Sequence, residues 1–300
     1  MKIFITRKLP FWDEVGKPLT EAGHEVKFGK LEELDGNYEG LLCLLTDKIT
    51  DAVLTGAPKL KIIANYAVGF DNIDVPACKA KNILVTNTPS EAVNESVAEM
   101  AWTLMLALSR RLIEANDFVR NAAYRGWEPD IFLGEDLKGK TLGVIGTGRI
   151  GSLVSKRAEG FGMKVLGFSK SSGLKLADVL GQSDYVTLHL PLNPETTHII
   201  NKNNLPLFKK TAFLVNTARG PIVDEAEVVE ALRAGFIAGY GADVFENEPD
   251  PHPELLQMEN VILTPHIASA TRAARIDMGK IAVANLLAGL SGQTPANVVQ

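Results

Sequence analysis

Three kinds of ionisable side chain follow short apolar segments of this sequence, the place where open α/β sheets bind ligands. Arg219 follows the segment 213–216, and its planar guanidinium stays charged and can bind carboxylate or carbonyl oxygens. His266 follows the segment 260–264, and its imidazolium can give a proton to a forming alkoxide and take it back. A carboxylate on the other ring nitrogen would orient the imidazole and favour its protonated form. The candidates for that carboxylate are Glu246, Glu248 and Asp250.

A glycine-rich turn lies near the middle of the chain. The apolar segment 141–145 runs into Gly-Thr-Gly-Arg-Ile-Gly at 146–151, and a helical pattern follows. In such a turn Gly146 permits the tight bend, Gly148 lets the backbone approach phosphates, and Gly151 lets helix and strand pack closely. The helix N-terminus offers free N–H groups and the positive end of a dipole. This order predicts a site for the pyrophosphate of a dinucleotide.

The end of the next predicted strand departs from the usual pattern of NAD-binding folds. Those folds place Asp or Glu there for the ribose hydroxyls, whereas here Ser169 stands in that place. A serine removes the repulsion of a 2′-phosphate, and Lys170, followed by Ser171, adds a positive charge. Our hypothesis is that NADP(H) is preferred. The alternative is a neutral loop that also accepts NAD(H).

Apolar segments alternate with helical patterns, which is typical of parallel sheets with helices on both faces. The first series predicts strands at 2–6, 25–28, 40–45, 60–66 and 83–86, and a helix at 11–22. The second series begins with 141–145 and predicts strands at 164–168, 185–190, 213–216, 239–242 and 261–263. A helix at 94–111 separates the two series, and a last helix at 275–292 is expected to return to the first domain.

These patterns predict an α/β protein of two doubly wound parallel-sheet domains with a cleft between them. The first is expected at 1–96 and 273–300, and the family resemblance described below implies that it is a flavodoxin-like substrate-binding (catalytic) domain. The second is a Rossmann-type dinucleotide-binding domain, expected at 97–272. A chain of 300 residues is long enough for two such domains.

The composition is that of a globular protein in a reducing compartment. The net charge of -5 gives no reason to expect a nucleic-acid partner. No apolar run is long enough to cross a bilayer, and the first residues lack the features of a signal peptide. Cys43 and Cys78 suggest buried thiols, so we expect the cytoplasm and no membrane partner. No histidine has the spacing of a metal ligand, which predicts no metal site.

Six motifs in order give the chain a family resemblance over essentially its whole length. They lie at 65–74, 146–151, 189–191, 216–220, 243–249 and 264–266. The chain resembles the D-isomer-specific 2-hydroxyacid dehydrogenases, and Asn-Tyr-Ala-Val-Gly-Phe-Asp-Asn-Ile-Asp at 65–74 is most similar to glyoxylate/hydroxypyruvate reductases. The resemblance implies an NAD(P)-dependent oxidoreductase that reduces a small 2-keto acid to the D-2-hydroxy acid. The sequence does not identify the keto acid.

The resemblance also implies the catalytic roles. Arg219 would bind and polarise the substrate, and His266 would act as acid and base. In the family the functional carboxylate directly precedes a proline, which selects Glu248 and leaves Glu246 as a solvated loop charge.

The implied binding contacts are distributed along the chain. Backbone N–H groups of Val68 and Gly69 would bind the substrate carboxylate, an anion-binding use of a turn. The implied cofactor contacts are Arg149 and Ile150 at the pyrophosphate, Pro191 and Thr217 at the nicotinamide ribose, and Asp243 at the carboxamide. The family usually forms dimers, so we expect a homodimer in which the segment 118–132 reaches a partner subunit.

Two other functions stay open. A D-3-phosphoglycerate or other D-2-hydroxyacid dehydrogenase would carry the same motifs, although the first domain shows no obvious basic cluster for a phosphate. A dinucleotide-sensing corepressor of this fold would keep Arg219, Glu248 and His266 while binding a protein partner. The absence of an added interaction segment favours the enzyme over the corepressor.

Overall fold

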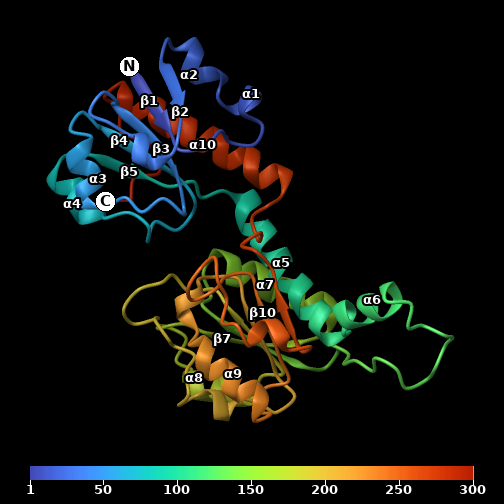
Figure 1. Cartoon of the computed structure of the whole chain (residues 1–300). Helices are drawn as coiled ribbons and strands as arrows, with labels where there is room; N and C mark the ends of the chain where they lie inside the picture. The colour runs from blue at the N-terminus through green and yellow to red at the C-terminus, as the bar shows by residue number, and fades with distance from the viewer. Residues whose placement is uncertain (300) are drawn as a thin grey trace. The chain divides into compact units, whose positions relative to one another are not determined.

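The structure is a computed structural model that describes residues 1–299 and divides into two units (Figure 1). Unit 1 consists of Met1–Val93 and Ala270–Gln300, and unit 2 is Asn94–Ser269. Each contains one sheet in which every strand runs parallel to its neighbours. The predicted fold class of two parallel-sheet α/β domains is confirmed.

The sheet of unit 1 has the order β2-β1-β3-β4-β5. Its strands are β1 (Lys2–Ile5), β2 (Glu25–Phe28), β3 (Gly40–Leu44), β4 (Ile62–Tyr66) and β5 (Leu84–Thr86). The central strands β3 and β4 are almost entirely buried, as expected for parallel strands covered on both faces. Strand β2 lies on one side of β1, and β3, β4 and β5 follow on the other side, so the direction of strand addition reverses between β1 and β3. This is the flavodoxin-like arrangement.

Helices cover both faces of this sheet. They are α1 (Trp12–Val15), α2 (Lys17–Glu21), α3 (Asp51–Gly56), α4 (Val75–Ala80) and α10 (Arg272–Leu290). The long α10, red in Figure 1, packs on β3 and β4, which confirms that the last helix returns to the first domain. Gly289 makes this close packing feasible, because a Cβ there would lie 2.4 Å from Ile62 Cδ1. Leu54 of α3 and Cys78 of α4 belong to the buried cluster on the other face.

The sheet of unit 2 has the order β11-β10-β9-β8-β6-β7. Its strands are β6 (Thr141–Ile145), β7 (Lys164–Phe168), β8 (Tyr185–Leu188), β9 (Phe213–Asn216), β10 (Gly239–Ala242) and β11 (Val261–Leu263). The direction of strand addition reverses between β6 and β8. In open α/β sheets, such a reversal marks the crevice at the carboxyl ends of the strands where ligands bind.

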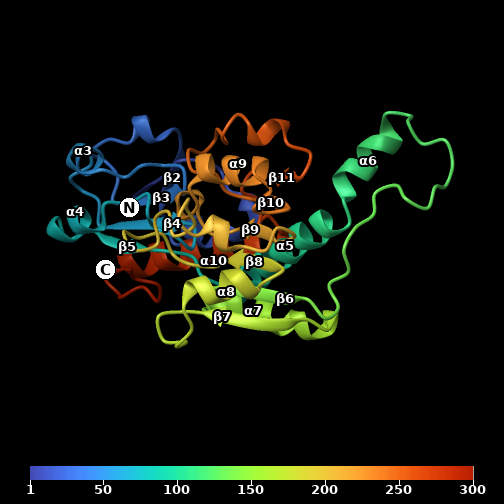
Figure 2. The ribbon, with the colours of Figure 1, turned by 90° about the horizontal axis from the view of Figure 1, so that it is seen from below.

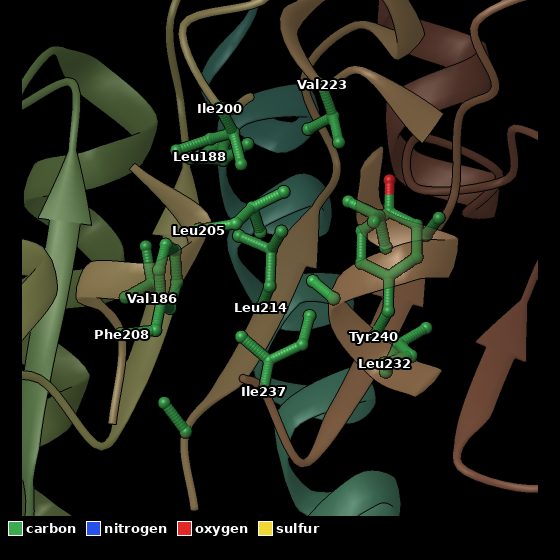
Figure 3. Close-up of a cluster of buried hydrophobic side chains, with 14 of the residues drawn as sticks. Val186, Leu188, Ile200, Leu205, Phe208, Leu214, Val223, Leu232, Ile237 and Tyr240 are labelled. Carbon is green, nitrogen blue, oxygen red and sulfur yellow. The ribbon is translucent and has the colours of Figure 1, made fainter. Parts of the chain in front are cut away.

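Two hydrophobic clusters fix the helices of unit 2. On one face, α5 (Glu91–Ser109) and α7 (Arg149–Ala158) pack on β6 through residues such as Trp102, Val154 and Val144. On the other face, α8 (Leu176–Gln182) and α9 (Glu225–Arg233) pack on the cluster that includes Val186, Leu214 and Tyr240 (Figure 3). The described residues also form 3-10 helices of one turn, which are η1 (Leu31–Glu33), η2 (Glu159–Phe161), η3 (Leu205–Leu207), η4 (Gly220–Ile222) and η5 (Leu255–Gln257).

Helix α6 (Leu112–Arg120) and the segment after it differ from the rest of unit 2. Both extend away from the unit 2 sheet in Figures 1 and 2. Their exposed apolar side chains are Leu112, Ile113, Val119, Tyr124, Trp127 and Leu133. Trp127 is the most exposed of these, at 80%. An apolar surface of this kind on a projecting segment is typical of a protein–protein contact.

The prediction of one helix over 11–22 is wrong. The structure has two short helices, α1 and α2, that meet at Gly16. The Trp12 ring packs so closely on Gly16 that a Cβ there would lie 2.2 Å from it. Pro18 also lacks the backbone N–H that a continuous helix would use at that position.

Both cysteines are buried free thiols. Burial raises the pKa of the Cys78 thiol to about 11, and burial and the nearby Asp47 raise the pKa of Cys43 well above its usual value. Neither thiol is therefore activated as a nucleophile. None of the helices within residues 1–299 combines the length and apolar character that crossing a bilayer requires.

Candidate active site

The predicted dinucleotide turn lies between β6 and α7, at the reversal of the unit 2 sheet. Gly146 has φ +99°, and a Cβ there would lie 2.4 Å from the carbonyl oxygen of His189. A Cβ at Gly151 would lie 2.0 Å from the Gly146 carbonyl oxygen. Gly148 differs, because a Cβ there would meet no described atom within 4 Å beyond its own neighbours. Gly146 and Gly151 thus allow the close backbone packing that the pattern predicts, whereas the approach of a phosphate to Gly148 stays a prediction.

The start of α7 supplies donors beside that space. Arg149 and Ile150 are the first two residues of the helix, so their N–H groups lack a partner within the helix. These donors and the helix dipole favour an anion.

A buried hydroxyl farther along the same edge supports the fit of a dinucleotide. Thr217 Oγ1, just after β9, is buried and has no hydrogen-bond partner among the described residues. A buried hydroxyl without a protein partner can bond a water or a ligand that the structure does not contain. Together with the donors at the start of α7, it fits a bound dinucleotide. Pro191, after β8, is exposed, and its carbonyl oxygen accepts a hydrogen bond from Thr196 Oγ1 at 2.7 Å.

The loop after β7 contains the predicted adenosine-ribose contacts. Ser169 Oγ lies 3.3 Å from Ser171 Oγ, and both residues are exposed or partly exposed. Lys170 forms an ion pair with Glu195, which lies in the loop after β8. Both side chains of this pair are largely exposed, so the pair contributes little to stability. A serine hydroxyl pair and a cation thus lie where an acid is usual, but the cation has an acidic neighbour.

Glu248 and His266 lie together at the opposite end of the sheet edge. Glu248 follows β10, His266 follows β11, and the Glu248 Oε2 atom is 3.0 Å from His266 Nδ1. The two side chains are 32% and 25% exposed, so the pair is reached by solvent yet partly desolvated. Burial raises the pKa of the Glu248 carboxyl. Hydrogen bonds from His266 and Phe245 and the charges of His266 and Arg219 outweigh that effect and lower the pKa below its usual value.

Asp243 fixes the loop that carries His266. Its carboxylate is fully buried and accepts hydrogen bonds from Thr264 Oγ1 at 2.6 Å, Ile267 N at 2.9 Å and Ala268 N at 2.7 Å. The Asp243 carbonyl oxygen accepts a further bond from the His266 N–H at 2.8 Å. These bonds stabilise the left-handed backbone of His266, φ +53°, which is uncommon for a residue other than glycine. A carboxylate has about four acceptor positions, so these three side-chain bonds leave about one, and the contact of Asp243 with a cofactor stays a prediction.

Arg219 lies in the loop after β9, between the turn and the acid–base pair along the sheet edge. The Asn216 side chain fixes this loop: its Nδ2 donates to the Arg219 carbonyl oxygen at 2.9 Å, and its Oδ1 accepts from Ala218 N at 3.0 Å. A Cβ at Gly220 would lie 1.8 Å from the Phe245 carbonyl oxygen, so this loop packs directly on the loop of Glu248. The charge of Arg219 contributes to the lowered pKa of Glu248, which agrees with that proximity.

The turn predicted to bind the substrate carboxylate belongs to unit 1. Val68 and Gly69 follow β4, and side-chain amides fix the orientation of this turn. Asn87 Nδ2 donates to the Val68 carbonyl oxygen at 2.7 Å, and Asn65 Nδ2 donates to the Gly69 carbonyl oxygen at 2.9 Å. The anion-binding role of the two N–H groups stays a prediction.

Sequence reasoning assigned one carboxylate wrongly. Glu246 is not a solvated loop charge: its Oε1 accepts a hydrogen bond from His198 Nε2 at 2.7 Å, and its Oε2 accepts one from Glu225 N at 3.2 Å. Sequence reasoning also missed Glu225, a buried carboxylate bonded to the same loop. No local pattern marks such a contact, because the partners are 21 positions apart.

Another histidine, His189, lies near the turn. Burial lowers the pKa of His189 to about 3, so its ring is neutral and bonds Thr187 Oγ1 at 2.9 Å. Within residues 1–299, no three His, Cys, Asp or Glu side chains are grouped as a metal site would require.

The six strands of unit 2 place these groups along one edge of the sheet. From β7 to β11 the order is Ser169, the glycine turn, Pro191, Arg219, Glu248 and His266. Five strand spacings separate the two ends, about 24 Å. One end can hold phosphates, and the other can hold an anion and transfer a proton.

Comparison with known proteins gives a consistent answer. The model of the D-isomer specific 2-hydroxyacid dehydrogenase NAD-binding domain matches residues 102–268. A glyoxylate reductase of Thermococcus litoralis is 43% identical, and the alignment covers 99% of this chain and 96% of that protein.

Two solved structures with bound cofactor are also similar over nearly all of this chain. One is an NADPH-dependent glyoxylate/hydroxypyruvate reductase from Sinorhizobium meliloti in complex with NADP and malonate. It is 32% identical with a TM-score of 0.89, and the match covers 99% of this chain and 96% of that one. The other is a D-lactate dehydrogenase from Aquifex aeolicus complexed with NAD and lactic acid. It is 33% identical with a TM-score of 0.85, and the match covers 100% of this chain and 99% of that one.

Proposed function

Because the chain belongs to the D-isomer specific 2-hydroxyacid dehydrogenases, we propose that it reduces a small 2-keto acid to the D-2-hydroxy acid, with glyoxylate or hydroxypyruvate as substrate. The chain is an NAD(P)-binding oxidoreductase by family, and the finer assignment rests on the site. The observation that carries it is the Glu248–His266 pair on the same sheet edge as the glycine turn.

Each residue of the site has a defined role in this reaction. The bound nicotinamide would supply a hydride to the keto carbon of the substrate. Arg219 binds the substrate and stabilises negative charge on its keto oxygen as the alkoxide forms. His266 donates a proton to that oxygen, and Glu248 on the other ring nitrogen orients the imidazole and stabilises its cation. In the reverse direction His266 accepts the proton.

The substrate proposal is supported by relatives whose names include glyoxylate and hydroxypyruvate. The test is oxidation of NADPH and NADH at 340 nm with glyoxylate, hydroxypyruvate, pyruvate, phenylpyruvate and 3-phosphohydroxypyruvate. We expect the highest kcat/KM with glyoxylate or hydroxypyruvate. Preference for 3-phosphohydroxypyruvate would identify a phosphoglycerate dehydrogenase instead. No turnover of any keto acid, with NADPH still bound, would favour a dinucleotide-sensing protein.

We propose that NADP(H) is the preferred cofactor and that NAD(H) binds less well. The serine hydroxyls and Lys170 after β7 can bind a 2′-phosphate, and no acid occupies the position of Ser169. Glu195 weakens this preference, because its carboxylate pairs with Lys170 and lies near the proposed position of the phosphate.

The substitution Ser169→Asp is expected to lower kcat/KM for NADPH by about 10–100-fold and leave NADH unchanged or improved. A carboxylate at this position would repel the 2′-phosphate and accept hydrogen bonds from the ribose hydroxyls. Steady-state kinetics with both cofactors at one ionic strength measures the change.

Glu195→Gln provides the opposing control for that experiment. Removing this carboxylate leaves Lys170 without its acidic partner. The ratio of kcat/KM for NADPH to kcat/KM for NADH is therefore expected to rise a few-fold. A higher kcat/KM with NADH in the wild type would contradict the proposed preference. If Ser169→Asp lowers kcat/KM equally for both cofactors, the loop after β7 does not select the cofactor.

The substitution Glu248→Gln is expected to lower kcat for reduction by about 10–100-fold at neutral pH, which is part of the contribution of a positioned acid. An unchanged kcat in Glu248→Gln would contradict the role of Glu248 in positioning the acid.

The lowered pKa of Glu248 also favours folding at pH values above the usual carboxyl range. That contribution disappears as pH falls through the lowered pKa, so the Tm difference between the wild type and Glu248→Gln should vanish in acid. Thermal denaturation over a range of pH measures this difference.

We also propose a homodimer in the cytoplasm. The exposed apolar side chains of α6 and of the segment that follows it support a subunit contact. The buried free thiols agree with a reducing compartment. A monomeric mass by light scattering would contradict the dimer.

A further inference from the structure

One buried carboxylate near the site has no role in the proposed reaction. Glu225 is the first residue of α9, and it is only 3% exposed. Burial raises the pKa of this carboxyl, while hydrogen bonds from the backbone of Glu246 and His252 oppose that shift. Burying a carboxylate is costly unless its oxygens accept hydrogen bonds. The two backbone bonds offset that cost, and their positions indicate what the carboxylate does.

The two bonds enclose the loop that carries Glu248. Glu225 Oε1 accepts the Glu246 N–H at 3.0 Å, and Glu225 Oε2 accepts the His252 N–H at 3.0 Å. Residues 246 and 252 are the two ends of a loop, outside any strand, with Glu248 between them. One carboxylate therefore ties both ends of this loop to the start of α9. We call this arrangement the Glu225 clasp.

The contact is reciprocal. The Glu246 carboxylate accepts the Glu225 N–H at 3.2 Å, so each of the two glutamates satisfies the backbone donor of the other. Directly before the clasp, the Phe245 N–H donates to Glu248 Oε1 at 3.3 Å. The backbone that the clasp fixes at Glu246 is therefore adjacent to Phe245, whose N–H bonds Glu248.

We infer that Glu225 is a positioning residue for the acid–base pair: by bonding both ends of the loop it sets the place of Glu248 and, through Glu248, the orientation of the His266 ring. This inference rests on the proposed function, because it concerns the pair that transfers the proton. A carboxylate is required, since two N–H donors point at its two oxygens. The carbonyl oxygen of a glutamine would accept a hydrogen bond from one of these N–H groups, but its NH₂ group would face the other N–H, and two donors cannot bond each other.

Kinetics of Glu225→Gln tests the role when keto-acid reduction is observed. We expect kcat to fall about 10–100-fold, the loss that a small misplacement of a catalytic group can cause, with KM for NADPH unchanged. In a background of Glu248→Gln, the same substitution should change kcat by less than about twofold, because Glu225 acts through Glu248. Glu230→Gln, an exposed position on the same helix, should behave as wild type. An additive loss in the double variant would overturn the inference.

Nuclear magnetic resonance tests the clasp without turnover. The His266 Nδ1–H proton bonded to Glu248 is expected to resonate downfield in the wild type and in Glu230→Gln, and to shift or broaden in Glu225→Gln. An unchanged resonance in Glu225→Gln would overturn the inference even if the protein reduces keto acids. A changed resonance in a protein that turns over no keto acid would support the clasp and reject the proposed function.

Two further measurements apply if Glu225→Gln does not fold. In the wild type, the amides of Glu246 and His252 should exchange with solvent more slowly than the amide of the exposed Asn247. Equal exchange would show that the clasp is absent. Glu225→Asp keeps the charge but withdraws both oxygens by one methylene, and it should shift or broaden the His266 resonance relative to the wild type. A wild-type resonance in Glu225→Asp, together with wild-type kcat, would contradict the inference.

Discussion

Replacement of His266 by alanine is expected to lower kcat for keto-acid reduction by about two to four orders of magnitude. The variant removes the proton donor, so the alkoxide would have to take its proton from water. Cofactor affinity should change little, because the glycine turn lies at the other part of the sheet edge, after β6. Steady-state kinetics and a fluorescence titration with NADPH measure the two quantities separately.

A second histidine substitution controls for a general effect on the protein. His24→Gln changes a histidine of unit 1 that stands before β2, and it should leave kcat near the wild-type value. If His266→Ala lost less than about tenfold in kcat, another group would be the acid. If its NADPH affinity fell in parallel with kcat, the loss would reflect disturbed binding rather than missing proton transfer.

Replacement of Arg219 by alanine is expected to lower kcat/KM for the keto acid by about 100–1000-fold, the usual cost of removing one donor to a developing negative charge. KM for the keto acid should rise and kcat should fall, because Arg219 would bind the substrate and also stabilise the alkoxide. Arg219→Lys keeps the charge without the planar pair of donors, so it should recover only part of the activity. The panel of keto acids used for the wild type measures both constants.

The matched control for this variant is Arg233→Lys, near the end of α9. Arg233 pairs with Glu230 and Glu254 on the surface, and exposed pairs of this kind contribute little. The control should retain wild-type kcat and KM. If Arg219→Ala raised KM for NADPH and left the keto-acid constants unchanged, Arg219 would be a cofactor contact and not a substrate ligand.

The strands of this fold could be predicted because their signal is local. Buried parallel strands are short apolar runs bounded by polar or glycine residues, and β6, β9 and β10 have the predicted bounds. The less buried strands β2, β7 and β11 also have the predicted bounds. The segment 11–22, followed by Gly23 as a stop, predicts one helix. The missing N–H of Pro18 and the packing of the Trp12 ring on Gly16 divide it, and only the proline is visible as a local signal.

The candidate site could be predicted in part for the same reason. In a parallel sheet all strands end at one edge, so residues that follow the strands must lie along it, and Glu248 meets His266 as expected. The supporting contacts could not be predicted. Asp243 bonds residues 21 to 25 positions later, and Glu225 bonds residues 21 and 27 positions later. Such contacts depend on how the loops pack, which leaves no periodic trace in the sequence.

The most direct test of the central claim follows the hydride itself. NADPH carrying deuterium at the transferable C4 position is incubated with hydroxypyruvate, and the product is analysed by mass spectrometry and chiral chromatography. The account predicts D-glycerate with one deuterium at C2 from the wild type, and almost none from His266→Ala at the same time point. Product without deuterium at C2, or L-glycerate, or no product while NADPH remains bound, would contradict it.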